Sequence, residues 1–143
     1  MDKKQLTPME IMEGVIALEA EGFPIEKLSA YISDDCVVHE APSLPVVGGD
    51  WTGVQGFIDL MAAVRATFPN FLFELEKIIT DDASHAAVKA WISGDTPGGR
   101  FRTRLLEFWT FRDGKVVDVV PSWQDIKHVI DLYNAQAAVA ATQ

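Results

Sequence analysis

Cysteine and basic residues are scarce in this sequence, and each shortage excludes a class of protein. Cys36 is the single cysteine, so no intrachain disulfide can form, and its apolar neighbours predict a buried, unreactive thiol rather than a nucleophile. Lysine and arginine together number 12 against 21 aspartates and glutamates, which gives a formal net charge of -9. An acidic chain is not attracted to phosphate backbones, so we expect no nucleic-acid partner.

Long apolar segments and metal-ligand spacings are also missing. The sequence has no run of about 18 apolar residues, the length of a membrane-spanning helix, and its opening, MDKKQLTPME, has no apolar segment of the kind that targets a chain for export. We therefore expect a cytoplasmic protein that does not bind membranes. The histidines, His39, His85 and His128, are not spaced as metal ligands, and we expect neither a metal nor another cofactor.

The chain does have the size and apolar content of one packed domain. Of its 143 residues, 48% are hydrophobic and 23% are charged, as in globular domains. Apolar residues at helical spacing predict helices over about residues 7–22, 24–32 and 52–69. The first should begin with a capping box of Thr7 and Glu10, and the third with a similar box of Thr52 and Gln55.

Strand patterns alternate with turn-forming clusters through most of the second half of the chain. One strand is expected around Cys36 and Glu40, before the third helix, and four more are expected at residues 71–79, 85–93, 101–111 and 115–123. The short turns between those four imply antiparallel hairpins. A helix over residues 124–134 should follow, and the small-residue tail, 135–143, is expected to fray.

This order of elements predicts an α+β fold in which three N-terminal helices pack on one face of a strongly curved, mostly antiparallel sheet. Such a cone is difficult to fill, and an apolar cavity with a few polar groups is the default place for a ligand. Leu105, Trp109 and Phe111 share one face of their strand, whereas Leu106 and Phe108 lie on the other. The second apolar face predicts a homodimer through the backs of the sheets.

Glu40 is the first candidate for a functional side chain. It lies in the segment SDDCVVHEAPSLPVVGG, where strand alternation gives it the parity of Val38 and sends His39 to the opposite face. A carboxylate on the apolar face of a strand is either a paired structural group or part of a site.

Two segments, SDDCVVHEAPSLPVVGGDWTGVQG and EFWTFRDGKVVDVVPSW, together with the order of elements, resemble the nuclear-transport-factor-2-like (NTF2-like) superfamily. The resemblance is to its SnoaL-like and ketosteroid-isomerase-like branch, and it covers nearly the whole chain as a single domain. It implies that Glu40, which follows Asp34-Asp35 at the family's spacing, occupies the position of the catalytic base. Glu107, four residues before Phe111, matches a second carboxyl group that stays protonated, and Trp123 matches a pocket tryptophan.

We therefore expect a cofactor-independent proton-transfer enzyme, isomerase-like or cyclase-like, acting on a small apolar carbonyl compound. Glu40 would be the base and Glu107 the acid or oxyanion donor. The expected binding walls are Tyr31, Val38, Trp51, Phe57, Met61, Trp109 and Trp123.

Two alternatives stay open at this stage. The same cavity could serve a non-catalytic binding or dimerisation module, and Glu107 could pair with Arg102, Arg104 or Arg112 on a solvated strand face. The first helix lacks the tyrosine of the steroid isomerases, and the last strands lack the histidine of the cyclases. The substrate is therefore left open as well.

Overall fold

The protein is built on one six-stranded sheet. The structure, a computed structural model, describes residues 5–142 and the side chains of residues 5–135. In chain order the elements are α1 (Pro8–Leu18), the 3-10 helix η1 (Glu19–Glu21), α2 (Ile25–Leu28), β1 (Ile32–Glu40), β2 (Gly49–Thr52), α3 (Gly53–Thr67), β3 (Leu72–Thr80), β4 (His85–Thr96), β5 (Gly99–Arg112), β6 (Lys115–Trp123) and α4 (Ile126–Thr142).

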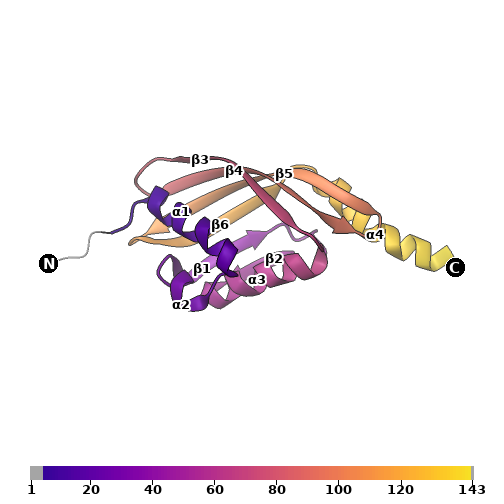
Figure 1. Cartoon of the computed structure of the whole chain (residues 1–143), viewed down its shortest axis with the longest axis horizontal. Coiled ribbons are helices and arrows are strands. Elements are labelled where there is room, and N and C mark those ends of the chain that lie inside the picture. The colour runs from indigo at the N-terminus through magenta and orange to yellow at the C-terminus, as the bar shows by residue number, and fades with distance from the viewer. Residues whose placement is uncertain (1–4, 143) are drawn as a thin grey trace.

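The strands are arranged in the order β2-β1-β6-β5-β4-β3. Only β1 and β6 run parallel among these neighbours, and every other pair is antiparallel. Helices α1, α2 and α3 lie on one side of the long strands, and α4 extends from the end of the sheet (Figure 1). This is the expected α+β cone with a mostly antiparallel sheet.

The expected capping box forms at α1 but not at α3. Thr7 and Glu10 form the predicted capping box, with each side chain bonded to the backbone of the other. At α3, Thr52 is the N-cap residue but makes no capping bond with its side chain. Gln55 donates instead to Oδ1 of Asp59, at 2.9 Å, so the prediction of a second capping box is wrong.

Two elements differ from the sequence prediction because tertiary pairing decides them. The helix expected over residues 24–32 is the single turn α2, since Ile32 already begins β1 and pairs with Val116 of β6. The sequence predicts no strand between Glu40 and the third helix, yet Gly49 to Thr52 form β2 by pairing with the end of β1. Local propensity does not register such pairings.

Helix α4 is longer than the sequence predicts, because it runs to Thr142 rather than ending near residue 134. Fraying of the tail, residues 135–143, stays a prediction, since Gln143 and the side chains after Ala135 lie outside the described residues. Tyr133 of α4 packs edge-on against Phe68, with 6.3 Å between the ring centroids. Phe68 also contacts Phe101 and Trp123, at 5.2 and 5.7 Å, so an aromatic cluster closes the end of the cone near α4.

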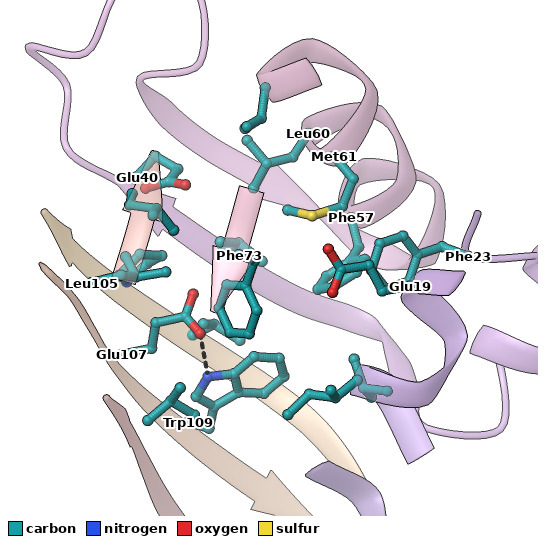
Figure 2. Close-up of a pocket in the computed structure, with 18 of the residues that line it drawn as sticks. Glu19, Phe23, Glu40, Phe57, Leu60, Met61, Phe73, Leu105, Glu107 and Trp109 are labelled. Atoms are coloured by element: carbon teal, nitrogen blue, oxygen red, sulfur yellow. Dashed lines mark hydrogen bonds between the residues drawn. The ribbon is translucent and has the colours of Figure 1, made fainter. Parts of the chain in front are cut away.

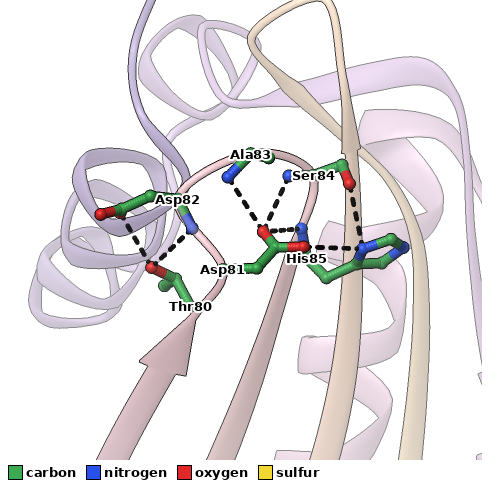
Figure 3. Close-up of polar contacts among 6 residues, drawn as sticks. All are labelled: Thr80, Asp81, Asp82, Ala83, Ser84 and His85. Carbon is green, nitrogen blue, oxygen red and sulfur yellow. Dashed lines mark hydrogen bonds and ion pairs between the residues drawn. The ribbon is translucent and has the colours of Figure 1, made fainter.

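The turn between β3 and β4 is held by one aspartate (Figure 3). Oδ1 of Asp81 accepts hydrogen bonds from the backbone N–H groups of Ala83, Ser84 and His85, each at 2.9 Å. Its other carboxylate oxygen lies 3.1 Å from Nδ1 of His85. Such a network satisfies backbone donors that a tight turn leaves unpaired, and it sets the start of β4.

Candidate functional site

A cavity of about 110 Å³ lies between α1, α3 and the inner face of the sheet. Its lining is apolar except for four charged residues, Glu19, Glu40, Arg65 and Glu107. An apolar cavity of roughly 150 Å³ holds benzene, so this one encloses slightly less than one ring, and a ligand of one ring would extend beyond it. It has the composition of a small-molecule site, with an apolar wall and few polar groups.

Most of the residues predicted to form the site do line this cavity. They come from β1, α3, β5 and β6, and they are Val38, Glu40, Phe57, Met61, Glu107, Trp109 and Trp123. Tyr31 and Trp51 are placed elsewhere, which corrects the expected wall. The Tyr31 ring lies against Gly14 of α1, and Nε1 of Trp51 donates to the backbone oxygen of Val47, at 2.9 Å. Neither side chain lines the cavity.

Glu40 ends β1 on the inner face of the sheet, as its parity with Val38 predicts. Its side chain is only 6% exposed, and Oε1 has no hydrogen-bond partner among the described residues. Burial, followed by the charge of Glu107, raises the pKa of Glu40 to about 8, while a hydrogen bond with the Trp123 side chain acts in the opposite direction. The neutral form of Glu40 is therefore favoured near neutral pH.

Glu107 of β5 also points into the cavity (Figure 2). Nε1 of Trp109 donates a hydrogen bond to Oε1 of Glu107, at 3.2 Å. Burial raises the pKa of Glu107 to about 7, and the bond from Trp109 opposes this by stabilising the ionised form. Glu107 is half-buried, because the cavity that it lines leaves part of its side chain uncovered.

The arginines that could have paired with Glu107 bind other carboxylates. Arg104 lies 3.1 Å from Glu76, and Arg112 lies 2.9 Å from Asp35. Arg102 is nearest to Glu74, at 3.9 Å. The solvated ion pair weighed for Glu107 is therefore not formed, and no lysine or arginine contributes to the pKa shift of Glu40 or Glu107.

Sheet register explains why the two glutamates meet. Glu107 is paired with Pro121 of β6, and Val38 is paired with Val119. Glu40 is two residues after Val38, so in a parallel pair it lies level with Pro121 on the other side of β6. Pro121 has no N–H group, which is consistent with the β1–β6 ladder ending at Val119. The two carboxyl groups thus flank Pro121, about two strand spacings apart, roughly 10 Å between the backbones.

His39 faces the other side of the sheet, as predicted from alternation. Its Nδ1 lies 2.9 Å from Oδ1 of Asp50 on β2, and its Nε2 lies 2.8 Å from Oδ1 of Asp118 on β6. Hydrogen bonds to Asp50 and then Asp118 raise the pKa of His39. This bridge ties β2, β1 and β6 together next to Glu40, and its two aspartates were not identified from the sequence.

Sequence reasoning also missed two charged residues of the cavity, Glu19 and Arg65. Helical spacing could have found both, because Glu19 is four residues after Val15 and Arg65 is four residues after Met61, and residues four apart share a helix face. Burial raises the pKa of Glu19, and the nearby charge of Arg65 lowers it. In Figure 2, Glu19 lies across the pocket from Glu40 and Glu107.

Neither a metal site nor a membrane span is present within the described part of the chain. No three histidine, cysteine, aspartate or glutamate side chains there are grouped to hold an ion. No helix there is long and apolar enough to cross a bilayer. Cys36 is buried, and burial raises the pKa of its thiol to about 12, which agrees with the expected inert cysteine.

The curved sheet, its helices and the enclosed cavity define an NTF2-like protein. Residues 15–119 match the family model described as the SnoaL-like domain, and the chain belongs to this family. No curated protein matches the sequence.

Solved structures share the fold at low sequence identity. An NTF2-like protein from Burkholderia thailandensis is 17% identical, with a TM-score of 0.77 over 89% of this chain and 97% of that one. IdmH, a candidate polyketide cyclase from Streptomyces antibioticus, is 19% identical, with a TM-score of 0.66 over 87% and 97%. TerC, co-crystallised with polyporic acid, is 16% identical, with a TM-score of 0.71 over 86% and 97%. These likenesses show the fold.

Proposed function

We propose that this protein is a cofactor-independent proton-transfer enzyme, of the isomerase or cyclase type, that acts on a small apolar carbonyl compound bound in the cavity. The observation that carries the proposal is the pair Glu40 and Glu107, two carboxyl groups in one apolar cavity with no cation contributing to the pKa shift of either. A purely structural carboxylate would be paired or exposed. The fold shared with IdmH is compatible with this class of chemistry.

The pair supplies the two groups that enolisation requires. Ionised Glu107 removes a proton from the carbon next to the carbonyl, and neutral Glu40 donates a hydrogen bond to the carbonyl oxygen as it becomes negative. In a β,γ-unsaturated ketone, return of the proton from Glu107 to the γ-carbon isomerises the compound. In a compound with a second carbonyl, attack of the enolate carbon closes a ring, and the alkoxide that forms takes the proton held by Glu107. Each step conserves protons within the pair and the substrate.

The roles assigned here reverse those expected from the sequence, where Glu40 was the base. Two observations support the reversal. Both carboxyl groups interact with a tryptophan, Glu107 with Trp109 and Glu40 with Trp123, but one oxygen of Glu40, Oε1, has no partner among the described residues. Burial raises the pKa of both groups, and the charge of Glu107 raises that of Glu40 further. Because the groups interact, their two proton losses belong to the pair.

Hydrogen–deuterium exchange at the methyl group of acetophenone in D₂O, followed by NMR, tests the proposal. The one-proton state of the pair is the active one, so the exchange rate should be highest between about pH 7 and 8. Glu107→Gln, which loses the base, should lower the rate at least about 100-fold. Glu40→Gln retains a hydrogen-bond donor and should lose less.

Glu13→Gln is the matched control, because Glu13 is exposed on α1 and does not line the cavity. It should exchange at the wild-type rate. The alternative is a binding module, which the small, largely apolar cavity also suits. Binding of acetophenone with an exchange rate that neither glutamine variant lowers would rule out the enzyme and favour that alternative.

A further inference from the structure

Arg65 is the one cationic residue among those that line the cavity in the described part of the chain. We propose that Arg65 binds an acidic oxygen of the ligand, so that the compound is an apolar ketone with a carboxylate or phenolate at the end remote from the reacting carbonyl. The inference rests on the proposed function only in taking the ligand to be an apolar carbonyl compound.

The position of Arg65 fits the outer end of such a ligand. It lies in the last turn of α3, and its own side chain is exposed. The cavity residues Ile16, Met61 and Phe73 are half-buried, whereas Glu40 is almost fully buried. Arg65 therefore belongs to the part of the lining that is nearest to solvent.

Arg65 is also across the cavity from the two glutamates. Its guanidinium carbon lies 5.7 Å from the centroid of the Phe23 ring, and its charge lowers the pKa of Glu19. Phe23 and Glu19 lie on the side of the pocket opposite Glu40 and Glu107 (Figure 2). The lining thus has Arg65 with Glu19 at one end and the carboxyl pair Glu40 and Glu107 at the other.

The N–H donors of the Arg65 guanidinium are available to a ligand. Among the described residues it forms no ion pair within 4.0 Å, although ten such pairs are formed elsewhere. The guanidinium carbon lies over the Phe23 ring, a contact that uses none of the N–H donors, and those donors can bind a carboxylate by two parallel bonds. Glu19 competes for the same charge from a distance, so it should weaken acid binding.

The charges of the cavity also fix the orientation of an acidic ketone. A carboxylate next to Glu40 and Glu107 would be repelled and desolvated, whereas next to Arg65 it is neutralised and can keep contact with water. The ketone end is then directed toward the carboxyl pair. A ligand of one ring, with the two groups at opposite ends, matches this separation of charge, and its acidic end extends past the enclosed 110 Å³ toward Arg65 and solvent.

Three one-ring probes test the assignment by isothermal titration calorimetry on the full chain. They are acetophenone, 4-acetylbenzoate and the neutral 4-acetylbenzamide. Wild-type protein should bind 4-acetylbenzoate about tenfold more tightly than 4-acetylbenzamide, the difference expected for one charge-assisted contact. Arg65→Gln should abolish that preference and leave acetophenone affinity within about twofold, and Glu19→Gln should increase the preference.

Two further variants separate a specific contact from general charge. Arg65→Lys keeps the charge but loses the planar fork, so it should retain part of the preference. Lys115→Gln removes a cation from an exposed position outside the cavity and should leave all three affinities unchanged. A preference that survives in Arg65→Gln, or that Lys115→Gln removes equally, would overturn the assignment.

Other outcomes are equally decisive. Arg65 is also placed to interact with the C-terminal end of α3. If Arg65→Gln lowers Tm while the ratio of the affinities is unchanged, that structural role is the whole explanation. No binding of 4-acetylbenzoate at millimolar concentration would overturn the ligand class. The function proposal is judged separately, because binding can depend on Arg65 without exchange, and exchange can proceed without any dependence on Arg65.

Discussion

Glu40 is a carboxyl group that folding moves to a place where its charged form is disfavoured. Its pKa rises from the usual 4.5 to about 8, mainly because of burial. A raised folded-state pKa means that the contribution of Glu40 to stability is complete below about pH 4.5 and is lost as pH rises through about 8. The same residue that is useful for proton transfer should therefore cost stability in alkaline solution.

Replacement of Glu40 by glutamine should remove that cost. We expect Glu40→Gln to be more stable than wild type at pH 8 to 9, by on the order of 1 kcal/mol or more, and to approach wild type near pH 4. The free energy of unfolding, measured by urea titration across this pH range, checks the prediction. Glu13→Gln, at an exposed position on α1, is the control and should not reproduce the gain in stability. Marked destabilisation of Glu40→Gln at pH 8 would mean that Glu40 has a structural partner in its ionised form.

His39 must be kept in mind when that pH dependence is measured. Its pKa is raised by Asp50 and Asp118, so its stabilising contribution is also complete at low pH and is lost as pH rises through its folded-state pKa. Wild type and Glu40→Gln share this contribution, and it cancels in their difference. Adjacent residues of β1 thus titrate on opposite faces of one sheet.

The turn between β3 and β4 is the element whose stability depends most clearly on one side chain. Asp81 accepts three backbone hydrogen bonds, and those bonds, led by the one from His85, hold its pKa well below its usual value. A lowered pKa means that the stabilisation is present at neutral pH and is lost as pH falls below the usual aspartate range. Asp81→Ala should therefore lower Tm by a few degrees at pH 7, measured by circular dichroism.

Asp81→Asn separates the hydrogen bonds from the charge. The amide oxygen can still accept from the turn but carries no full charge, so the fall in Tm should be smaller than for alanine. Equal Tm values for wild type and Asp81→Ala would show that pairing between β3 and β4 positions the turn without this side chain.

The strands β3 to β6 could be predicted from sequence because their signals are local. Alternating apolar residues end at clusters of Asp, Gly, Pro or Ser, and the hairpin geometry follows from the short turns. The strand β2 could not, because Gly49 to Thr52 become a strand only by pairing with β1. Helix α2 is short for the same reason, since the pairing of Ile32 with Val116 begins β1 early.

Some residues of the site could likewise be predicted from the sequence and others could not. The position of Glu40 on the inner face follows from strand parity, which a sequence displays directly. Tyr31 and Trp51 were assigned to the wall from residue type, but the ring of Tyr31 packs on Gly14 and Trp51 bonds to Val47. Arg65 could have been predicted, because it is four residues after the expected wall residue Met61 and therefore on the same face of the helix.

At the scale of the whole molecule, the sheet face away from the cavity exposes several large apolar side chains. Strand register aligns Ile79, Ala87, Phe108 and Val120 in one row across four strands. Phe108 is 50% exposed, and Ile79 and Val120 are exposed as well. A continuous apolar row of this kind favours association, and a second copy of the chain presents the same row about a two-fold axis.

We therefore expect a homodimer through the backs of the sheets. Light scattering at micromolar concentration should give twice the chain mass, and Phe108→Asp should give the monomer mass, because a charge buried in the interface has no partner. Val46→Asp is the control, since Val46 is an exposed apolar residue on the loop before β2. A monomeric wild type, or dissociation by both variants, would contradict the interface.

The two outer strands of the sheet carry a further consequence, for aggregation. An open sheet edge has unpaired backbone groups that can recruit another strand and begin a fibril. One edge, β2, is only four residues long, and the other, β3, has a bulge between Leu75 and Lys77 and the charged residues Glu74 and Glu76. Short length, a bulge and charge are the features that block edge pairing, so concentrated solutions of this chain should resist fibril growth even where its sheet faces associate.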